Sequence, residues 1–176
     1  MTMVTDDLER IGFGGGCHWC TEGVFQSLAG VQHVDQGWIA GKGKDATYAE
    51  AVIVAFDPKV ISLEVLIEIH LLTHSSNVNH SMRDKYRSAV YYFTERQGSE
   101  ASRKLADLNR KSNNTIVTKA LPFGGFKRNK ESFLNYYKTR PNAPFCTTFI
   151  DPKIKRLRET HGQYVELANS AGQQTR

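Results

Sequence analysis

Hydrophobic residues recur along the chain with the two spacings that distinguish strands from helices. Residues 50–56 alternate, with Glu50 and apolar residues on one side and small or apolar residues on the other, which predicts a strand. The four-residue spacing of Cys20, Val24 and Leu28 predicts a helix that ends near Gly30 as its C-terminal cap. The same reasoning predicts strands at residues 8–13, 31–39, 88–93 and 116–121, and helices at residues 62–73, 94–108, 133–137 and 154–165.

The order of these elements predicts a mixed α/β or α+β domain that opens with a parallel β-α-β unit. A chain of 176 residues with 40% hydrophobic content is long enough for one domain with a full core. Residues 75–85 are predicted to form a polar loop and residues 123–126 a turn. We expect residues 1–167 to form a single catalytic domain, followed by a polar, disordered tail at residues 168–176.

The composition argues against a membrane-spanning, a disulfide-stabilised or a nucleic-acid-binding protein. No apolar run approaches the roughly 20 residues that span a bilayer, and the first seven residues are acidic where a signal peptide is basic. Three cysteines, an odd number, indicate reactive thiols in a reducing compartment rather than a disulfide framework. The chain has a net charge of +5. Its basic residues are mixed with acidic and aromatic residues, and no nucleic-acid-binding motif accompanies them. We therefore expect a soluble cytoplasmic monomer without a nucleic-acid or membrane partner.

Cys17 and Cys20 lie where three consecutive glycines run into the first predicted helix. The free amides and the positive dipole end of a helix N-terminus stabilise an anion, so a cysteine there loses its proton near neutral pH. Thiolate is the nucleophilic form of cysteine. The sequence therefore predicts a reactive thiol at Cys17, at or just before the helix start.

Two other interpretations of this segment are open at the level of the residues. A Cys-x-x-Cys pair can be structural, with the glycines only fitting a tight bend. Zinc is the second alternative, since the candidate ligands are Cys17, His18, Cys20, His74 and His80. Adjacent cysteine and histidine with a distant histidine pair is not the usual spacing of a structural zinc site, and we expect no metal.

Glu50 is the best candidate for an acid that works beside Cys17. It shares a strand face with Val52, Val54 and Phe56, and desolvation there raises the pKa of a carboxyl so that it carries a proton near neutral pH. The alternative is a glutamate at a strand end that reaches solvent. Periodicity alone does not decide between them.

Three aromatic residues accompany these groups. Trp19 is too bulky for an exposed turn and is expected to wall an apolar pocket beside the thiol, which suits a methyl group. Tyr48 and Tyr86 lead into predicted strands, where tyrosines are mostly packing residues. Their chemistry is not evident from spacing.

Several blocks of the chain resemble the A-type peptide methionine sulfoxide reductases. The most specific is Gly-Cys-His-Trp-Cys at residues 16–20, which is similar to the family's Gly-Cys-Phe-Trp segment. Weaker blocks follow in the family's order at residues 37–41, 46–52, 57–58, 86–89 and 144–146. The resemblance covers residues 9–160. It implies a ferredoxin-like α+β core, a two-layer α/β sandwich, with additional helices and strands.

The resemblance also implies a reaction. Cys17 would attack the sulfoxide sulfur while Glu50 and the hydroxyls of Tyr48 and Tyr86 bind and protonate the oxygen, leaving a sulfenic acid on Cys17. No cofactor is implied. The activity would be that of a peptide-methionine (S)-S-oxide reductase.

A second thiol would then condense with the sulfenic acid, and thioredoxin or a similar dithiol would reduce the disulfide. The candidates are Cys20, three residues away, and Cys146, which matches the family's C-terminal recycling cysteine. We favour Cys146 for the first contact, with a relay between the two as the alternative.

Departures from the family pattern concern the substrate. His18 replaces the aromatic that cages the substrate methyl with Trp19, and Trp38 stands in an altered block, so we assign Trp19, His18 and Trp38 to substrate binding. The segment between Tyr48 and Glu50 is shorter than the family pattern by about ten residues. Residues 130–134 and the positions of Ser81 and Arg83 also differ.

These departures predict that a free small-molecule sulfoxide is preferred over peptide methionine sulfoxide. The alternatives are a redox-sensing or binding module on the same fold and a thiol-disulfide oxidoreductase using Cys17 and Cys20.

Overall fold

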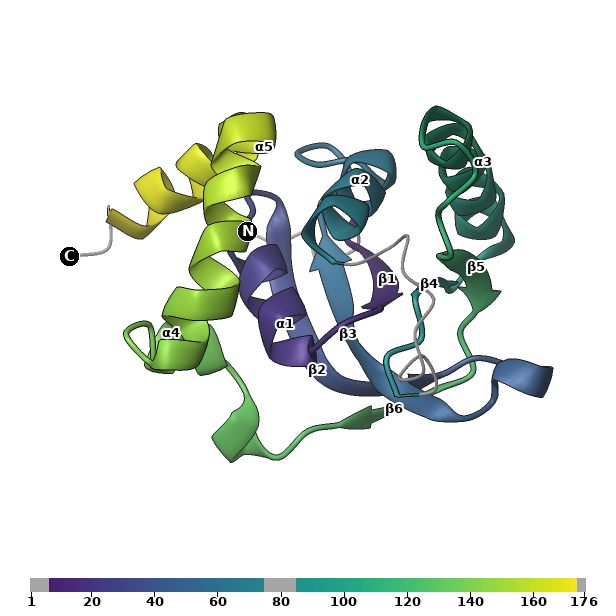
Figure 1. Ribbon diagram of the computed structural model, residues 1–176, viewed down its shortest axis with the longest axis horizontal. Coiled ribbons are helices and arrows are strands. Elements are labelled where there is room, and N and C mark those ends of the chain that lie inside the picture. The colour runs from purple at the N-terminus through teal and green to yellow at the C-terminus, as the bar shows by residue number, and fades with distance from the viewer. Residues whose placement is uncertain (1–6, 75–84, 174–176) are drawn as a thin grey trace.

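The computed structural model describes residues 7–74 and 85–173, with helices gathered along one side of a sheet (Figure 1). The strands are β1 (Glu9–Gly14), β2 (Val31–Ala40), β3 (Tyr48–Phe56), β4 (Ala89–Tyr92), β5 (Lys119–Pro122) and β6 (Gly125–Arg128). The α-helices are α1 (His18–Gln26), α2 (Leu63–Thr73), α3 (Glu95–Lys111), α4 (Tyr136–Thr139) and α5 (Asp151–Gln173). Short 3-10 turns lie at Gly43–Asp45 and Glu131–Phe133, and a π-helical turn at Cys146–Ile150 leads into α5.

The strand order is β5-β4-β1-β3-β2-β6. Its centre, β4-β1-β3-β2, is antiparallel, with α1 connecting β1 to β2 and α2 connecting β3 to β4. This is the split β-α-β arrangement of ferredoxin-like folds, and it confirms the expected α+β class. The predicted β-α-β opening is present, since β1 and β2 are both antiparallel to β3, but β3 lies between them.

The sheet is curled so that its two edges approach one another. Phe123 donates its backbone N–H to Tyr92 of β4, and the next residue, Gly124, donates to Ala40 of β2. A Cβ on Gly124 would lie 2.0 Å from the carbonyl oxygen of Gly41, so only glycine permits this approach. The predicted turn at residues 123–126 is therefore wrong in its second half, where β6 begins.

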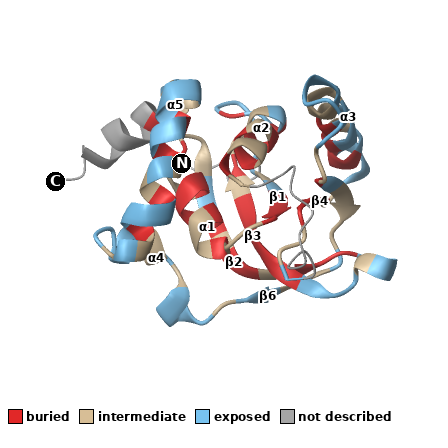
Figure 2. Ribbon diagram, viewed as in Figure 1, coloured by how far each residue is buried: buried red, intermediate tan, exposed pale blue. Residues whose placement is uncertain are grey.

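Two apolar clusters hold the sheet. The larger one packs Val52, Val54 and Phe56 against the inward faces of the helices, which appear red in Figure 2. The smaller one, on the opposite face, contains Ile39, Ala51, Ile53, Ala89 and Tyr91, with aromatic residues of the edge segments packed on it. Because β3 is buried on both faces, its backbone and side chains provide a fixed platform for Glu50.

The start of α1 follows the prediction and its end does not. Cys17 is the N-cap of α1, but the helix ends at Gln26, with Ser27 as its cap. Gly30 instead turns the chain into β2 with φ +90, and its carbonyl accepts from the N–H of Asp57. Leu28 lies in this turn and is buried nonetheless.

The helices α2 and α3 lie where the sequence predicts helices, and each begins with a side-chain cap. The Ser62 side chain accepts from the N–H of Val65, and the Thr94 side chain accepts from the N–H of Gln97. The predicted strand at residues 116–121 begins only at Lys119. Most of the predicted polar loop at 75–85, with Ser81, Arg83 and His80, lies outside the described residues.

The α5 helix continues to Gln173, into the segment where the sequence predicts a disordered tail. The division into a domain and a tail stays a prediction. Within the described ranges, no helix combines the length and apolar character needed to cross a membrane.

Candidate active site

The glycine turn after β1 sets the position of the reactive thiol. The carbonyl of Gly14 accepts a hydrogen bond from Nε2 of His70, 2.8 Å away on α2. Gly15 has φ +140, and a Cβ there would lie 2.6 Å from the His74 ring, so a side chain would be both strained and obstructed. The turn places Cys17 at the N-terminus of α1, as the sequence predicts.

Cys17 is held as a thiolate near neutral pH. A hydrogen bond from the Cys20 side chain is the largest influence that lowers the pKa of Cys17, to about 6. The N–H groups of Trp19 and Cys20 and the positive charge of Lys85 act in the same direction, whereas burial opposes them. The thiolate is therefore the dominant form of Cys17 at pH 7.

The other two thiols remain protonated. The hydrogen bond to Cys17 raises the pKa of Cys20 most, followed by burial and by the negative charge of Cys17. Cys146 is buried in the π-helical turn, and burial raises the pKa of its thiol. Cys146 also raises the pKa of Cys20 slightly, so Cys20 interacts with both of the other cysteines. All three are free thiols.

Glu50 is buried, so the structure decides against a glutamate that reaches solvent. Only 8% of the residue is exposed, and its Oε2 atom is buried without a hydrogen-bond partner among the described residues. Burial raises the pKa of Glu50 to about 7, with a further contribution from the Cys17 thiolate, while Lys85 acts against it. The interaction between these two groups indicates that Cys17 and Glu50 belong to one site.

His18 is turned toward Glu50. Its Nδ1 lies 2.9 Å from the carbonyl oxygen of Gly37, and its Nε2 lies 3.3 Å from Oε1 of Glu50. Trp38 packs edge-on against the His18 ring at 5.3 Å. With 4% of its surface exposed, His18 has little area left to contact a substrate.

Two residues of this site were not anticipated from the sequence. Gln36 is fully buried on β2, and its amide joins Asn129 to the carbonyl of Phe133. Asn129 in turn lies 3.5 Å from Nε2 of His18. The sequence does contain one signal for Gln36, a polar residue between apolar positions on one face of a predicted strand. It contains no signal for Asn129.

Aromatic residues form the wall that the sequence predicts around Trp19. The Trp19 ring stacks on Tyr136 at 4.3 Å with an interplanar angle of 2°, and Phe145 meets it edge-on at 5.5 Å. Phe133 is 6.1 Å away and 40% exposed. Trp19 is thus fixed beside Cys17 as one wall of an apolar surface.

The two tyrosines occupy different places. Tyr48 shares the strand face of Glu50 at about 7 Å along β3, is 40% exposed, and carries the Lys127 ammonium 4.2 Å over its ring. Tyr86 hydrogen-bonds Lys85, whose charge acts on both Cys17 and Glu50. Tyr86 is therefore tied to the site through Lys85, and Tyr48 lies at its rim.

The sequence matches the family described as peptide methionine sulfoxide reductase over residues 9–165. The chain belongs to this family. Membership confirms the resemblance drawn from short motifs and makes the protein an oxidoreductase.

Curated relatives within the family cover most of the chain. The peptide methionine sulfoxide reductase MsrA of Sulfolobus acidocaldarius is 34% identical over 164 residues, which cover 85% of this chain and 93% of the relative. The MsrA of Deinococcus radiodurans is 35% identical over 170 residues, covering 88% and 82%.

Solved structures share the fold. Mxr1 from Saccharomyces cerevisiae in its reduced form aligns with a TM-score of 0.71 and 22% identity, covering 84% of this chain and 94% of that one. Methionine sulfoxide reductase A of Corynebacterium diphtheriae aligns with a TM-score of 0.64 and 21% identity, covering 78% and 77%.

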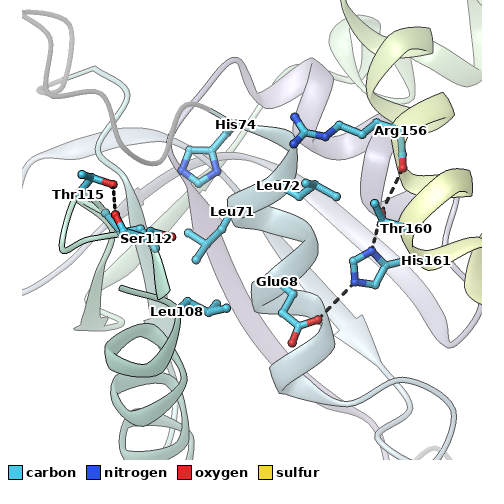
Figure 3. Close-up of a pocket in the computed structure, with 11 residues that line it drawn as sticks. Glu68, Leu71, Leu72, His74, Leu108, Ser112, Thr115, Arg156, Thr160 and His161 are labelled. Carbon is cyan, nitrogen blue, oxygen red and sulfur yellow. Dashed lines mark hydrogen bonds and ion pairs between the residues drawn. The ribbon is translucent and has the colours of Figure 1, made fainter. Parts of the chain in front are cut away.

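A separate cavity of about 540 Å³ lies between α2, α3 and α5 (Figure 3). Glu68 and His161 form an ion pair across part of its wall, and Leu71 and Leu108 supply apolar surface. None of the three cysteines, all of them described, lines this cavity. The cavity is therefore separate from the cysteines at the N-terminus of α1.

Metal binding was the alternative interpretation of the cysteine and histidine cluster. Across residues 7–74 and 85–173, no group of three or more histidine, cysteine, aspartate or glutamate side chains is placed to hold a metal ion. His18 is hydrogen-bonded to Gly37 and faces Glu50, while His74 lies beside Ser88. The fifth candidate, His80, is outside the described residues.

Proposed function

We propose that the protein reduces methionine sulfoxide, peptide-bound or free, or a related methyl sulfoxide, to the thioether. One observation carries the proposal: a thiolate and an un-ionised carboxylic acid coexist in one site near neutral pH. The pKa of Cys17 is about 6 and that of Glu50 about 7, an order opposite to that of the free side chains. A nucleophile and a proton donor are thereby available together.

In the first step, the Cys17 thiolate attacks the sulfoxide sulfur and Glu50 gives its proton to the sulfoxide oxygen. The sulfur–oxygen bond of the substrate breaks, and the oxygen passes to Cys17 as a sulfenic acid. Cys17 is oxidised by two electrons, the substrate is reduced by two, and Glu50 is left as a carboxylate that regains a proton from solvent. Tyr86 and Tyr48 are proposed to assist by hydrogen-bonding the sulfoxide oxygen.

In the second step, Cys20 is proposed to attack the Cys17 sulfenic acid, forming a disulfide and releasing water. Cys20 already hydrogen-bonds Cys17, and the Cys17 negative charge is one cause of its raised pKa. Once Cys17 is a neutral sulfenic acid that charge is gone, so Cys20 ionises more readily when its thiolate is needed.

Cys146 is proposed to act after Cys20, exchanging with the Cys17–Cys20 disulfide. This order differs from our sequence-based preference for Cys146 as the first contact, and it rests on the hydrogen bond between Cys17 and Cys20. A thioredoxin is the proposed reductant. A solved structure with the same fold is Mxr1 of Saccharomyces cerevisiae in complex with Trx2 (TM-score 0.61, 20% identity, 76% of this chain and 88% of that one).

The substrate methyl is proposed to lie against Trp19, with Trp38 nearby. Trp19 is fixed by stacking on Tyr136, so it offers an apolar surface without a cost for ordering it. His18 is buried against Glu50 and Gly37, and we assign it no contact with the methyl group. Preference for a free over a peptide-bound sulfoxide stays a prediction.

The proposed order of the cysteines is tested by single turnover without reductant. Cys146→Ser is expected to lose two thiols, as wild type does, because Cys17 and Cys20 suffice for the first disulfide. Cys20→Ser is expected to accumulate a sulfenic acid on Cys17, measured by mass spectrometry of its dimedone adduct. Disulfide formation at the wild-type rate in Cys20→Ser, with a persistent sulfenic acid in Cys146→Ser, would reverse the order.

The pH dependence of the same single-turnover rate tests the proposal itself. The second-order rate constant, measured at low sulfoxide concentration, is expected to rise as Cys17 ionises, with a midpoint at about pH 6. It is expected to fall as Glu50 loses its proton, with a midpoint at about pH 7. Stopped-flow fluorescence of Trp19 is a suitable readout. A rate that keeps rising above pH 8 would contradict an acid role for Glu50.

A further inference from the structure

A chain of partly buried polar contacts leads from the backbone of Phe133 to Glu50. Nε2 of Gln36 lies 3.1 Å from the carbonyl of Phe133, and Oε1 of Gln36 lies 2.7 Å from Nδ2 of Asn129. The same Asn129 nitrogen is 3.5 Å from Nε2 of His18, which is 3.3 Å from Oε1 of Glu50. Three elements far apart in sequence thus meet at one imidazole.

The direction of every bond in this chain is fixed by its first member. A backbone carbonyl only accepts, so the Gln36 amide nitrogen donates to Phe133, which leaves Gln36 Oε1 as an acceptor. Asn129 must then direct its amide nitrogen at Gln36, and its own oxygen accepts from the N–H of Lys130 at 2.9 Å. The amide nitrogen therefore also points its second hydrogen at His18.

His18 is fixed from both sides. The Gly37 carbonyl accepts only, so Nδ1 of His18 carries the hydrogen. Nε2 faces the Asn129 donor and must present its lone pair. Nε2 has one lone pair, which the Glu50 contact at 3.3 Å shares with Asn129, so that contact is attractive only when Glu50 supplies the hydrogen.

We infer that His18 is a positioning residue whose fixed tautomer holds Glu50 in its protonated form in the free enzyme. The inference deepens the proposed function, on which it rests for its catalytic meaning. It assigns His18 to the acid and withdraws it from the substrate methyl.

The charged alternative, an imidazolium paired with a carboxylate, is disfavoured by the surroundings. Burial lowers the pKa of His18 and raises the pKa of Glu50, so each partner is pushed toward its neutral form. The other charged groups acting on the pair are the Cys17 thiolate, which opposes a carboxylate, and Lys85, which opposes an imidazolium. Trp38 covers the imidazole with an apolar ring.

The arrangement loads the acid before the substrate arrives. After Glu50 has given its proton to the sulfoxide oxygen, the His18 lone pair faces a carboxylate across 3.3 Å. Two acceptors at that distance repel each other, which favours uptake of a proton from solvent. His18 thus favours the protonated form of Glu50 both before the substrate binds and after the proton has been given away.

The tautomer is tested directly in the wild-type protein by ¹⁵N NMR of the histidine side chains at about pH 6.5, with His18→Phe assigning the resonance. We expect a neutral His18 ring with hydrogen on Nδ1. A hydrogen on Nε2, in the neutral or the cationic ring, would overturn the inference.

The consequence for Glu50 is tested in His18→Phe, which keeps an aromatic ring against Trp38 but removes the acceptor. The Glu50 midpoint is followed by the infrared C=O stretch that Glu50→Gln abolishes, and independently by the alkaline limb of the single-turnover profile. Both are expected to move down by about one pH unit, which corresponds to about a ten-fold slower reaction at pH 8 and about two-fold at pH 6. An unchanged or raised midpoint would overturn the inference.

Lys85→Met is the matched control, because it removes a charge that lowers the pKa of Glu50, and the midpoint is expected to move up instead of down. Thermal unfolding of both variants shows whether either is destabilised. The infrared midpoint is read without turnover, so it tests the role of His18 even if no sulfoxide is reduced. Absence of reduction with the expected midpoint shift would count against the proposed function alone.

Discussion

Cys17→Ser is expected to reduce methyl sulfoxide turnover by more than about a thousand-fold, because a serine hydroxyl at this N-cap stays protonated near neutral pH. The hydrogen bond from Cys20 and the backbone amides lower the pKa of a thiol to about 6, but they are insufficient to ionise an alcohol. Thioether formation with dithiothreitol as reductant, measured by chromatography, gives the rate. Tyrosine and tryptophan packing around the site should be unchanged by so small a substitution.

Cys146→Ser is the matched substitution, since it also replaces a thiol with a hydroxyl. It is expected to form one thioether per protein in the absence of reductant, whereas Cys17→Ser forms none. If Cys17→Ser kept a rate within about ten-fold of wild type while Cys20→Ser lost its activity, the nucleophile would be Cys20, and the roles assigned to Cys17 and Cys20 would have to be exchanged.

Glu50→Gln is expected to slow the first step by about a hundred-fold to ten-thousand-fold, the range that a positioned general acid contributes. The amide keeps the shape of the side chain but has no acid proton, and it also removes the carboxylate limb from the pH profile. Because Glu50 is still un-ionised where Cys17 loses its proton, the thiolate should persist in Glu50→Gln, measured by its reaction with a small alkylating agent across pH. Single-turnover kinetics and alkylation together separate proton donation from nucleophile activation.

Glu22→Gln is the control for removing a buried carboxyl. Glu22 lies on α1 with 1% exposure, and its oxygens accept from the N–H groups of Asn135 and Tyr136 at the start of α4. Its loss should lower the free energy of unfolding, because these charge-assisted bonds dock α4 on α1, without removing the acid. A Glu50→Gln rate within about three-fold of wild type would contradict proton donation by Glu50.

The catalytic pair was accessible from the sequence because local rules place each member. Three glycines before a helical stripe locate Cys17 at the N-cap, and strand alternation puts Glu50 on the face of Val52 and Val54. Neither rule depends on the rest of the chain. The family resemblance added which reaction these two groups serve.

What the sequence did not reveal depends on contacts between distant segments. The sequence predicts a turn at residues 123–126, and the second half of that segment belongs to β6 because the sheet curls until Gly124 reaches Ala40. The Gln36–Asn129 bond joins residues 93 positions apart, and no periodicity predicts it. His18 is oriented by contacts with Gly37 and Asn129 that the sequence does not reveal, so the sequence alone indicates a change in the substrate pocket at this position.

The order in which the thiols react is another feature that the sequence did not reveal. Cys20 lies three positions after Cys17 at the start of α1, within hydrogen-bonding distance of it, whereas Cys146 reaches the site through the π-helical turn before α5. The family resemblance favours Cys146 as the first thiol to react with the Cys17 sulfenic acid. The geometry at the start of α1 favours Cys20.

The central claim is that Cys17 takes the oxygen of a sulfoxide while Glu50 supplies the proton. Its most direct test is a stoichiometric reaction of the fully reduced wild-type protein with a methyl sulfoxide at about pH 6.5, without reductant. For the first turnover the account predicts one thioether released per protein, two thiols lost, and a disulfide between Cys17 and Cys20 that is mapped before Cys146 exchanges with it. Thiol loss without thioether, or thioether formation by Cys17→Ser, would contradict it.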